Sequence, residues 1–154
     1  MLRTTILRHE PDPEGPQPHF DWLLEAAPGT LDDDRIVPTF RCSRRPDRLA
    51  IGESTRLQAI DPHRGWWLSR EVFEEVTMTP PSGKARVIQS GILDSGPSSP
   101  FSSMESTVRW SQSVMTMTYR LESRGSGPVL VTRIAPFSST DESSLSPVNG
   151  IPLP

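Results

Sequence analysis

The sequence has a single cysteine, Cys42, in 154 residues, which excludes an internal disulfide. It also has no apolar run approaching the roughly 20 residues that cross a bilayer, and its N-terminus lacks the hydrophobic core of a signal peptide. We therefore expect a reducing, cytoplasmic location and no membrane contact. Because no histidine lies near Cys42 in the sequence, we expect this residue to pack in the core and not to act as a nucleophile.

Lysine is also scarce, since Lys84 is the only one and arginine carries the remaining positive charge. The formal net charge of −3 argues against a general nucleic-acid-binding protein. The charge is unevenly distributed along the chain, however. The segment from Arg35 to Arg70 contains eight arginines and three acidic residues, a local excess of five positive charges. Two interpretations stay open: a phosphate-binding surface, for which the guanidinium fork is suited, or a genome that favours arginine codons.

The content of hydrophobic residues is only 34%, and there are 17 prolines, a composition typical of a loop-rich globular chain. Alternating apolar residues indicate an all-β domain. The predicted strands cover residues 2–7, 19–25, 36–41, 85–89, 115–121 and 129–134. Residues 66–76 suit either a short amphipathic helix or a strand, and we predict a strand. Residues 91–103, dense in Gly, Pro and Ser, predict a long loop, and residues 44–47 predict a loop or helical turn that overhangs the pocket.

The C-terminal part gives the clearest strand pattern. Met115, Met117, Tyr119 and Leu121 alternate with polar residues, which predicts that these four are buried and that the two methionines pack in the core. Residues 123–128 predict a hairpin to the last strand. From residue 138 the chain is rich in Ser and Pro without periodicity, so we expect one domain over 1–137 and a disordered tail over 138–154.

The chain's three histidines are the candidate chemical groups. In a strand over residues 19–25, His19 and Asp21 share one face, whereas Phe20, Trp22 and Leu24 lie on the other and supply core. An imidazole and a carboxylate at this spacing can converge on one divalent cation, although two ligands alone hold a metal poorly. His9 and His63 would have to complete the site, and sequence spacing does not decide whether they do.

Three motifs in order carry a family resemblance. They are Arg8-His9-Glu10, then His19-Phe20-Asp21-Trp22-Leu23-Leu24-Glu25, then Pro62-His63-Arg64 ahead of Trp67-Leu68-Ser69-Arg70-Glu71. The chain resembles the 3′-phosphoesterase domain of bacterial DNA ligase D, and more closely the short stand-alone proteins related to it. In that family the corresponding motifs read Lys-His-Asp, His-Tyr-Asp-Phe-Arg-Leu-Glu, and a histidine shortly before a strand.

The resemblance implies a small closed or partly open antiparallel β-barrel with few short helices. It implies a metal site of His9, His19, Asp21 and His63, holding manganese, with zinc or cobalt as alternatives. The implied activity is hydrolysis at phosphate-blocked 3′ ends of nucleic acid in DNA repair, including non-homologous end joining, with repair proteins as partners. For this activity the candidate catalytic residues are His63, and Arg64 and Arg70 as the nearest candidate phosphate clamps, whereas Glu25 is expected to serve structure.

Two positions depart from the family pattern. Leu23 stands where the family has an arginine aimed at the phosphate, and Trp67 stands where it has a tyrosine. Enzymatic activity is therefore left open, and the alternative is an inactive barrel that binds DNA ends or a repair partner. A purely structural or regulatory barrel is the third interpretation. The acidic run Asp32-Asp33-Asp34 is expected to form a solvated turn.

Overall fold

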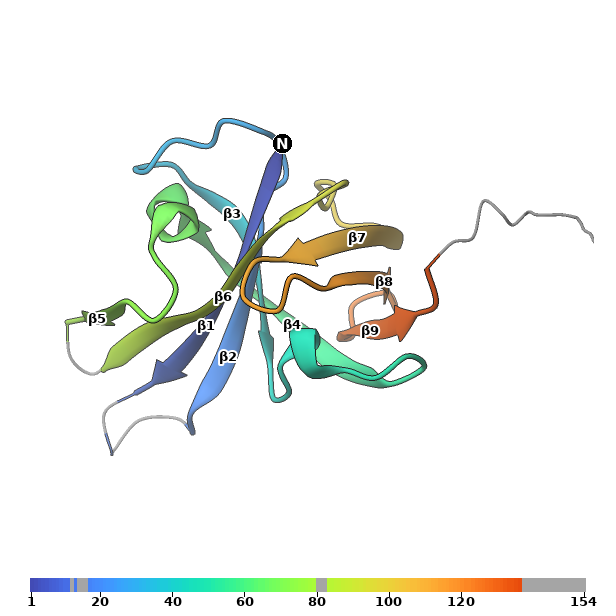
Figure 1. The fold of residues 1–154 in the computed structure, drawn as a ribbon, viewed down its shortest axis with the longest axis horizontal. Coiled ribbons are helices and arrows are strands. Elements are labelled where there is room, and N and C mark those ends of the chain that lie inside the picture. The colour runs from blue at the N-terminus through green and yellow to red at the C-terminus, as the bar shows by residue number, and fades with distance from the viewer. Residues whose placement is uncertain (12, 14–16, 80–82, 137–154) are drawn as a thin grey trace, which may run out of the picture.

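The computed structural model describes residues 1–11, 13, 17–79 and 83–136 (Figure 1). Its strands are all paired antiparallel, and eight of them close a barrel because β1 pairs with both β2 and β6. The strands are β1 (Leu2–Glu10), β2 (His19–Leu24), β3 (Arg35–Cys42), β4 (Ser54–Arg64), β5 (Glu75–Thr77), β6 (Lys84–Leu93), β7 (Met104–Trp110), β8 (Thr116–Glu122) and β9 (Val129–Ile134). β5 is the additional strand and pairs with β6, on the edge of β6 opposite β1. The predicted all-β barrel is confirmed.

The helical content of the described residues is two short 3₁₀ segments, η1 (Pro46–Arg48) and η2 (Gly65–Ser69), as the expectation of few short helices requires. Neither is long or apolar enough to span a membrane.

The barrel interior is filled around the fully buried Trp22 of β2. Its ring lies 5.2 Å from that of Tyr119 and 6.4 Å from that of Trp110, both from the far wall, which are distances typical of favourable aromatic pairs. The indole N–H of Trp22 donates to Thr4 Oγ1 at 2.9 Å, so the buried polar atom is satisfied. The predicted core role of Trp22 is confirmed.

A second apolar cluster covers the outer face of β1, β2, β3 and β6. It consists of Leu7, Leu23, Val37, Trp67, Leu68, Ala85 and Val87. The segment from η2 to β5 supplies Trp67 and Leu68 to it, and lies beside these strands in Figure 1. Side chains of β2 that point out of the barrel are therefore buried as well, which removes water from the face that carries His19 and Asp21.

Several sequence predictions were wrong in their bounds. The strand predicted over 66–76 is a 3₁₀ helix, a turn and the short β5, because Trp67 and Leu68 pack over the barrel from one turn of helix. The predicted loop 91–103 begins too early, since β6 continues to Leu93. Gly91 lies within β6, and glycine is required at this position because a Cβ would collide with the carbonyl of Arg109 on β7. Met115 was predicted to be buried, yet it lies in the turn before β8 and is 45% exposed.

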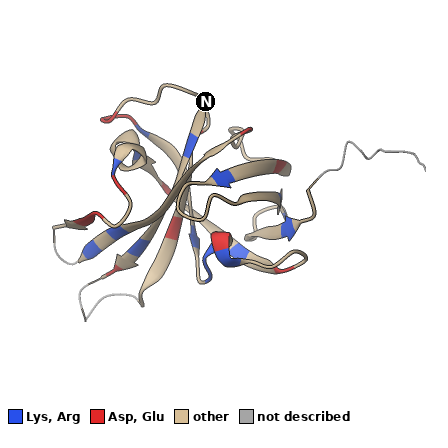
Figure 2. Ribbon diagram, viewed as in Figure 1, with Lys and Arg blue, Asp and Glu red and all other residues tan. Residues whose placement is uncertain are grey.

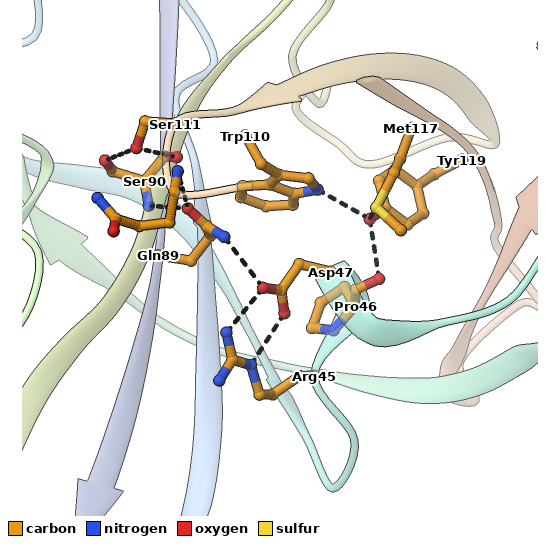
Figure 3. A network of polar contacts seen from close by, with 10 residues as sticks. Arg45, Pro46, Asp47, Gln89, Ser90, Trp110, Ser111, Met117 and Tyr119 are labelled. Atoms are coloured by element: carbon orange, nitrogen blue, oxygen red, sulfur yellow. Dashed lines mark hydrogen bonds and ion pairs between the residues drawn. The ribbon is translucent and has the colours of Figure 1, made fainter. Parts of the chain in front are cut away.

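The segment 44–47, predicted to overhang the pocket, instead packs against the barrel interior (Figure 3). The phenol of Tyr119 donates to the carbonyl of Pro46 at 2.8 Å. Asp47 accepts from Arg45 at 2.7 Å and from Gln89 at 3.2 Å. This network ties η1 to β6 and β8. The tail predicted over 138–154 lies outside the described residues.

Candidate metal centre

His9, His19, Asp21 and His63 lie together on the outer face of the barrel. His9 and His19 are directly opposite each other in the β1–β2 ladder, and strand alternation places Asp21 on the same face as His19. His63 comes from the end of β4, where it pairs with Val37 of β3. The four residues come from three segments of the chain, and the structure brings them together as the single-site hypothesis requires.

The atoms that could ligate a metal are close to one another. His9 Nδ1 lies 3.0 Å from His19 Nε2, and His19 Nε2 lies 3.5 Å from Asp21 Oδ1. The candidate ligand atoms of these three residues are all within 4.8 Å of one another. His63 Nε2 lies 3.8 Å from the other carboxylate oxygen, Asp21 Oδ2. His63 thus lies beside the compact group of three, with its Nε2 next to the Asp21 carboxylate.

Backbone carbonyls select the tautomers of two of these histidines. His19 Nδ1 lies 3.1 Å from the carbonyl of Gln17, and His63 Nδ1 lies 3.1 Å from the carbonyl of Asp61. Since a carbonyl only accepts, each Nδ1 carries the hydrogen, and in the neutral ring the lone pair is on Nε2, toward Asp21. Burial lowers the pKa of both imidazoles, which favours the neutral form that ligates metals.

The donor set fits a divalent cation. Asp21 is buried, at 3% exposed, and within the described part of the chain its Oδ1 accepts no hydrogen bond. It faces an imidazole nitrogen and the Nε of Arg41 at 3.6 Å, beyond hydrogen-bond distance, which is a costly arrangement for a buried carboxylate. Two ligands at about 2.1 Å from one ion are separated by about 3.0 Å in octahedral and about 3.4 Å in tetrahedral geometry. The observed separations of 3.0 and 3.5 Å match these values. Imidazole with carboxylate is a ligand set for manganese, zinc and cobalt alike.

An open pocket of about 560 Å³ leads to this group, and arginines line its wall. Arg41 of β3 is opposite Asp21 in the ladder, and its Nε lies 3.6 Å from Asp21 Oδ1. Arg35, at the start of β3, and Arg64, at the end of β4, line the same pocket. No motif in the sequence distinguishes Arg35 or Arg41 from the other arginines of the segment. Only the cross-strand register of β2 and β3 identifies Arg41 as a neighbour of the site.

The two arginines predicted as phosphate clamps differ in position. Arg64 lines the pocket and lies over the Trp66 ring at 5.3 Å. Arg70 stacks on the same ring at 4.2 Å, donates to the Trp66 carbonyl at 3.2 Å and pairs with Glu74 at 4.0 Å. Arg64 is therefore available to a ligand in the pocket, whereas Arg70 is outside the pocket lining and holds Trp66 in place.

Glu25 has a structural environment, as expected. It is fully buried and accepts hydrogen bonds from the backbone and guanidinium of Arg3 at 2.9–3.2 Å and from the Thr30 amide at 3.0 Å. Burial would raise the pKa of its carboxyl, but these hydrogen bonds outweigh that effect and lower it to about 2. The acidic run predicted as a turn does form one, closed by the amide of Asp34, which donates to the carbonyl of Leu31 at 3.1 Å. The carbonyls of Asp32 and Asp34 accept from the backbone of η2.

Charge of one sign does not dominate the molecule: basic and acidic residues are intermixed along the ribbon (Figure 2). A scan against protein-family models finds no match to this chain, and neither does a search of curated proteins. The resemblance to the ligase D phosphoesterase domain stays a hypothesis, and the geometry of the pocket is the independent basis for assigning a function.

Proposed function

We propose that this protein is a divalent-metal-dependent phosphoesterase that processes the 3′ ends of nucleic acid in DNA repair. The observation that carries the proposal is the buried Asp21, whose Oδ1 lacks a hydrogen-bond partner among the described residues and faces imidazole nitrogens, in a pocket walled by arginines. A buried carboxylate with neutral imidazoles is suited to a cation, and the three guanidinium groups that line the pocket are suited to a phosphate that approaches it.

Each residue has a role that follows from its position. His9, His19 and Asp21 hold the ion, which when bound supplies Lewis-acid polarisation of a phosphoryl oxygen. The His63 side chain is less buried than those of His19 and Asp21 and lines the pocket. There its Nε2 exchanges a proton with the leaving or attacking oxygen. Manganese is the proposed ion, with zinc or cobalt as alternatives. Cytoplasmic DNA-repair proteins are the proposed partners.

Arg41 supplies the guanidinium that the family motif places two residues after the aspartate. Leu23 occupies that motif position here and is fully buried in the outer apolar cluster. Arg41, one strand over, lies beside Asp21, with a side chain that is 37% exposed and so reaches the pocket. Arg35 and Arg64 add charge on the adjoining wall. The loss of the motif arginine is thus compensated from β3.

The test is incubation of the manganese-loaded protein with duplexes that end in a 3′-phosphate or a 3′-ribonucleotide. We expect release of phosphate or of the terminal nucleoside, loss of at least about 100-fold in rate for Asp21→Asn, and a loss of about 10- to 100-fold for Arg41→Ala. Arg109→Ala on β7, four strands away around the barrel, is the matched control. Turnover that persists in Asp21→Asn would refute the proposal.

The second candidate is a binding module that docks DNA ends or a repair partner without turnover. The observation that favours it is Leu23, because an apolar residue replaces the catalytic arginine of the motif. End-labelled duplexes bound by the metal-loaded protein and recovered uncleaved would establish this alternative in place of the enzyme.

A further inference from the structure

A second hollow adjoins the metal pocket on the barrel's outer surface. It encloses about 830 Å³ between the start of β2, the paired strands β3 and β4, and the hairpin loop at residues 126–128. Arg41 lines both hollows. We call this second hollow the β3–β4 groove. A ligand whose end lies at Asp21 can therefore continue past Arg41 into the groove.

The lining of the β3–β4 groove suits a polyanion with apolar faces. Among the described residues that line it there are two arginines, Arg41 and Arg56, and there is no carboxylate. Pro18, Ala59 and Pro128, which are exposed, contribute apolar surface. Charged and apolar groups side by side are what a nucleotide chain requires, since it alternates phosphates with flat, poorly solvated bases.

Arg56 is an arginine of the groove that no acidic side chain of the described residues neutralises. It is exposed on β4 and, within the described part of the chain, forms no ion pair. By contrast, Arg44 and Arg45 of the same arginine-rich segment are neutralised by Glu53 and Asp47, at 3.2 and 2.7 Å. Of the arginines between residues 35 and 70, Arg35, Arg56 and Arg64 line the metal pocket or the groove without an ion pair in the described part of the chain.

We propose that the β3–β4 groove binds the unpaired segment immediately 5′ of the 3′ end, with phosphates on Arg41 and Arg56 and a base against Pro18, Ala59 and Pro128. This inference rests on the proposed function for the identity of the ligand. The volume lies within the roughly 300–1,000 Å³ of small-ligand sites, which suits unpaired nucleotides and not a duplex. The preferred substrate is therefore a 3′ overhang or a frayed end.

Binding tests this directly and needs no turnover. Fluorescence anisotropy of the metal-free full chain is measured with 5′-labelled single strands of DNA and of RNA, all ending in a 3′-hydroxyl, and with a blunt duplex. We expect single strands to bind at least about 10-fold more tightly than the duplex, and Arg56→Glu to weaken single-strand binding by about 10-fold or more. Arg109→Glu, the control on β7, should change it by less than about 3-fold. Circular dichroism melting verifies that both variants are folded.

Equal weakening by Arg56→Glu and Arg109→Glu, or equal affinity for single strand and duplex, would overturn the groove assignment. Turnover separates this failure from failure of the proposed function. If the manganese-loaded protein cleaves a 3′-phosphorylated overhang but Arg56→Glu leaves KM unchanged, the groove is wrong and the phosphoesterase stands. If no 3′ end is cleaved while Arg56→Glu still weakens single-strand binding selectively, the groove stands and the enzyme does not.

Discussion

Replacement of Glu25 by Gln should destabilise the barrel in a pH-dependent way. The carboxylate is fully buried at the end of β2 and accepts four hydrogen bonds, from the amide, Nε and Nη2 of Arg3 and from the amide of Thr30. A Gln side chain keeps the shape but places an NH₂ group opposite one of these donors. It also leaves the guanidinium of Arg3, whose side chain is only 29% exposed, without its counter-charge.

The magnitude follows from the pKa of Glu25, which hydrogen bonding lowers to about 2 against an ordinary value of about 4.3. At about 1.4 kcal/mol per pKa unit this corresponds to about 3 kcal/mol, and partial exposure of Arg3 reduces it to about 2 to 3 kcal/mol. Since the folded-state pKa is the lower one, the stabilisation is fully present above about pH 4.3 and is lost as the pH falls toward about 2.

The assay is chemical unfolding followed by tryptophan fluorescence at about pH 7 and about pH 3. We expect Glu25→Gln to lose about 2 to 3 kcal/mol at the higher pH and distinctly less at the lower one. Glu105→Gln is the matched control, since Glu105 pairs with Arg120 at 3.2 Å on the exposed surface and should matter by less than about 1 kcal/mol. Equal losses for the two variants, or a Glu25→Gln loss independent of pH, would refute the reasoning.

Three further predictions concern the scaffold. Trp22→Ala should cost about 3 to 5 kcal/mol in chemical denaturation, because it empties the centre of the interior, and a loss below about 1 kcal/mol would contradict the core assignment. Val114→Gly should raise the unfolding free energy by about 1 kcal/mol, since Val114 is 69% exposed and has a φ of 50°, which is unfavourable for a β-branched residue; a lower melting temperature would argue against strain there. Cys42 should resist maleimide at about pH 8 until denaturant is added, because burial raises its thiol pKa to about 12, and rapid labelling of the folded chain would disprove this.

Strand alternation was enough to predict β2, its buried Trp22 and the shared face of His19 and Asp21. The late hairpin was predicted for the same reason, since every second residue of β8 and of the first half of β9 is apolar and buried in the core. β4 was missed because its pairing with β3 is interrupted by register shifts near Val37, which break the simple period. β7 was missed because its inward positions include the small polar Ser106, which carries little apolar signal.

The candidate site depended on information that local sequence does not contain. The positions of His9 and His63 relative to Asp21 follow from ladder register between strands, which spacing along the chain does not determine. The role of Arg41 is likewise a matter of register with β2. The outer layer from η2 to β5 could not be anticipated either, because Trp66 to Val76 has a pattern compatible with helix or strand.

Metal titration of the full chain tests the central claim most directly. Isothermal calorimetry with manganese and, separately, with zinc should give one ion per chain, and at about 100 times the dissociation constant the ion should stabilise the fold by about 2.7 kcal/mol. His19→Ala and Asp21→Asn should abolish this binding, whereas Asp33→Asn, in the exposed turn before β3, should leave it intact. Binding that persists in Asp21→Asn, or the absence of binding by the unaltered chain, would contradict the account.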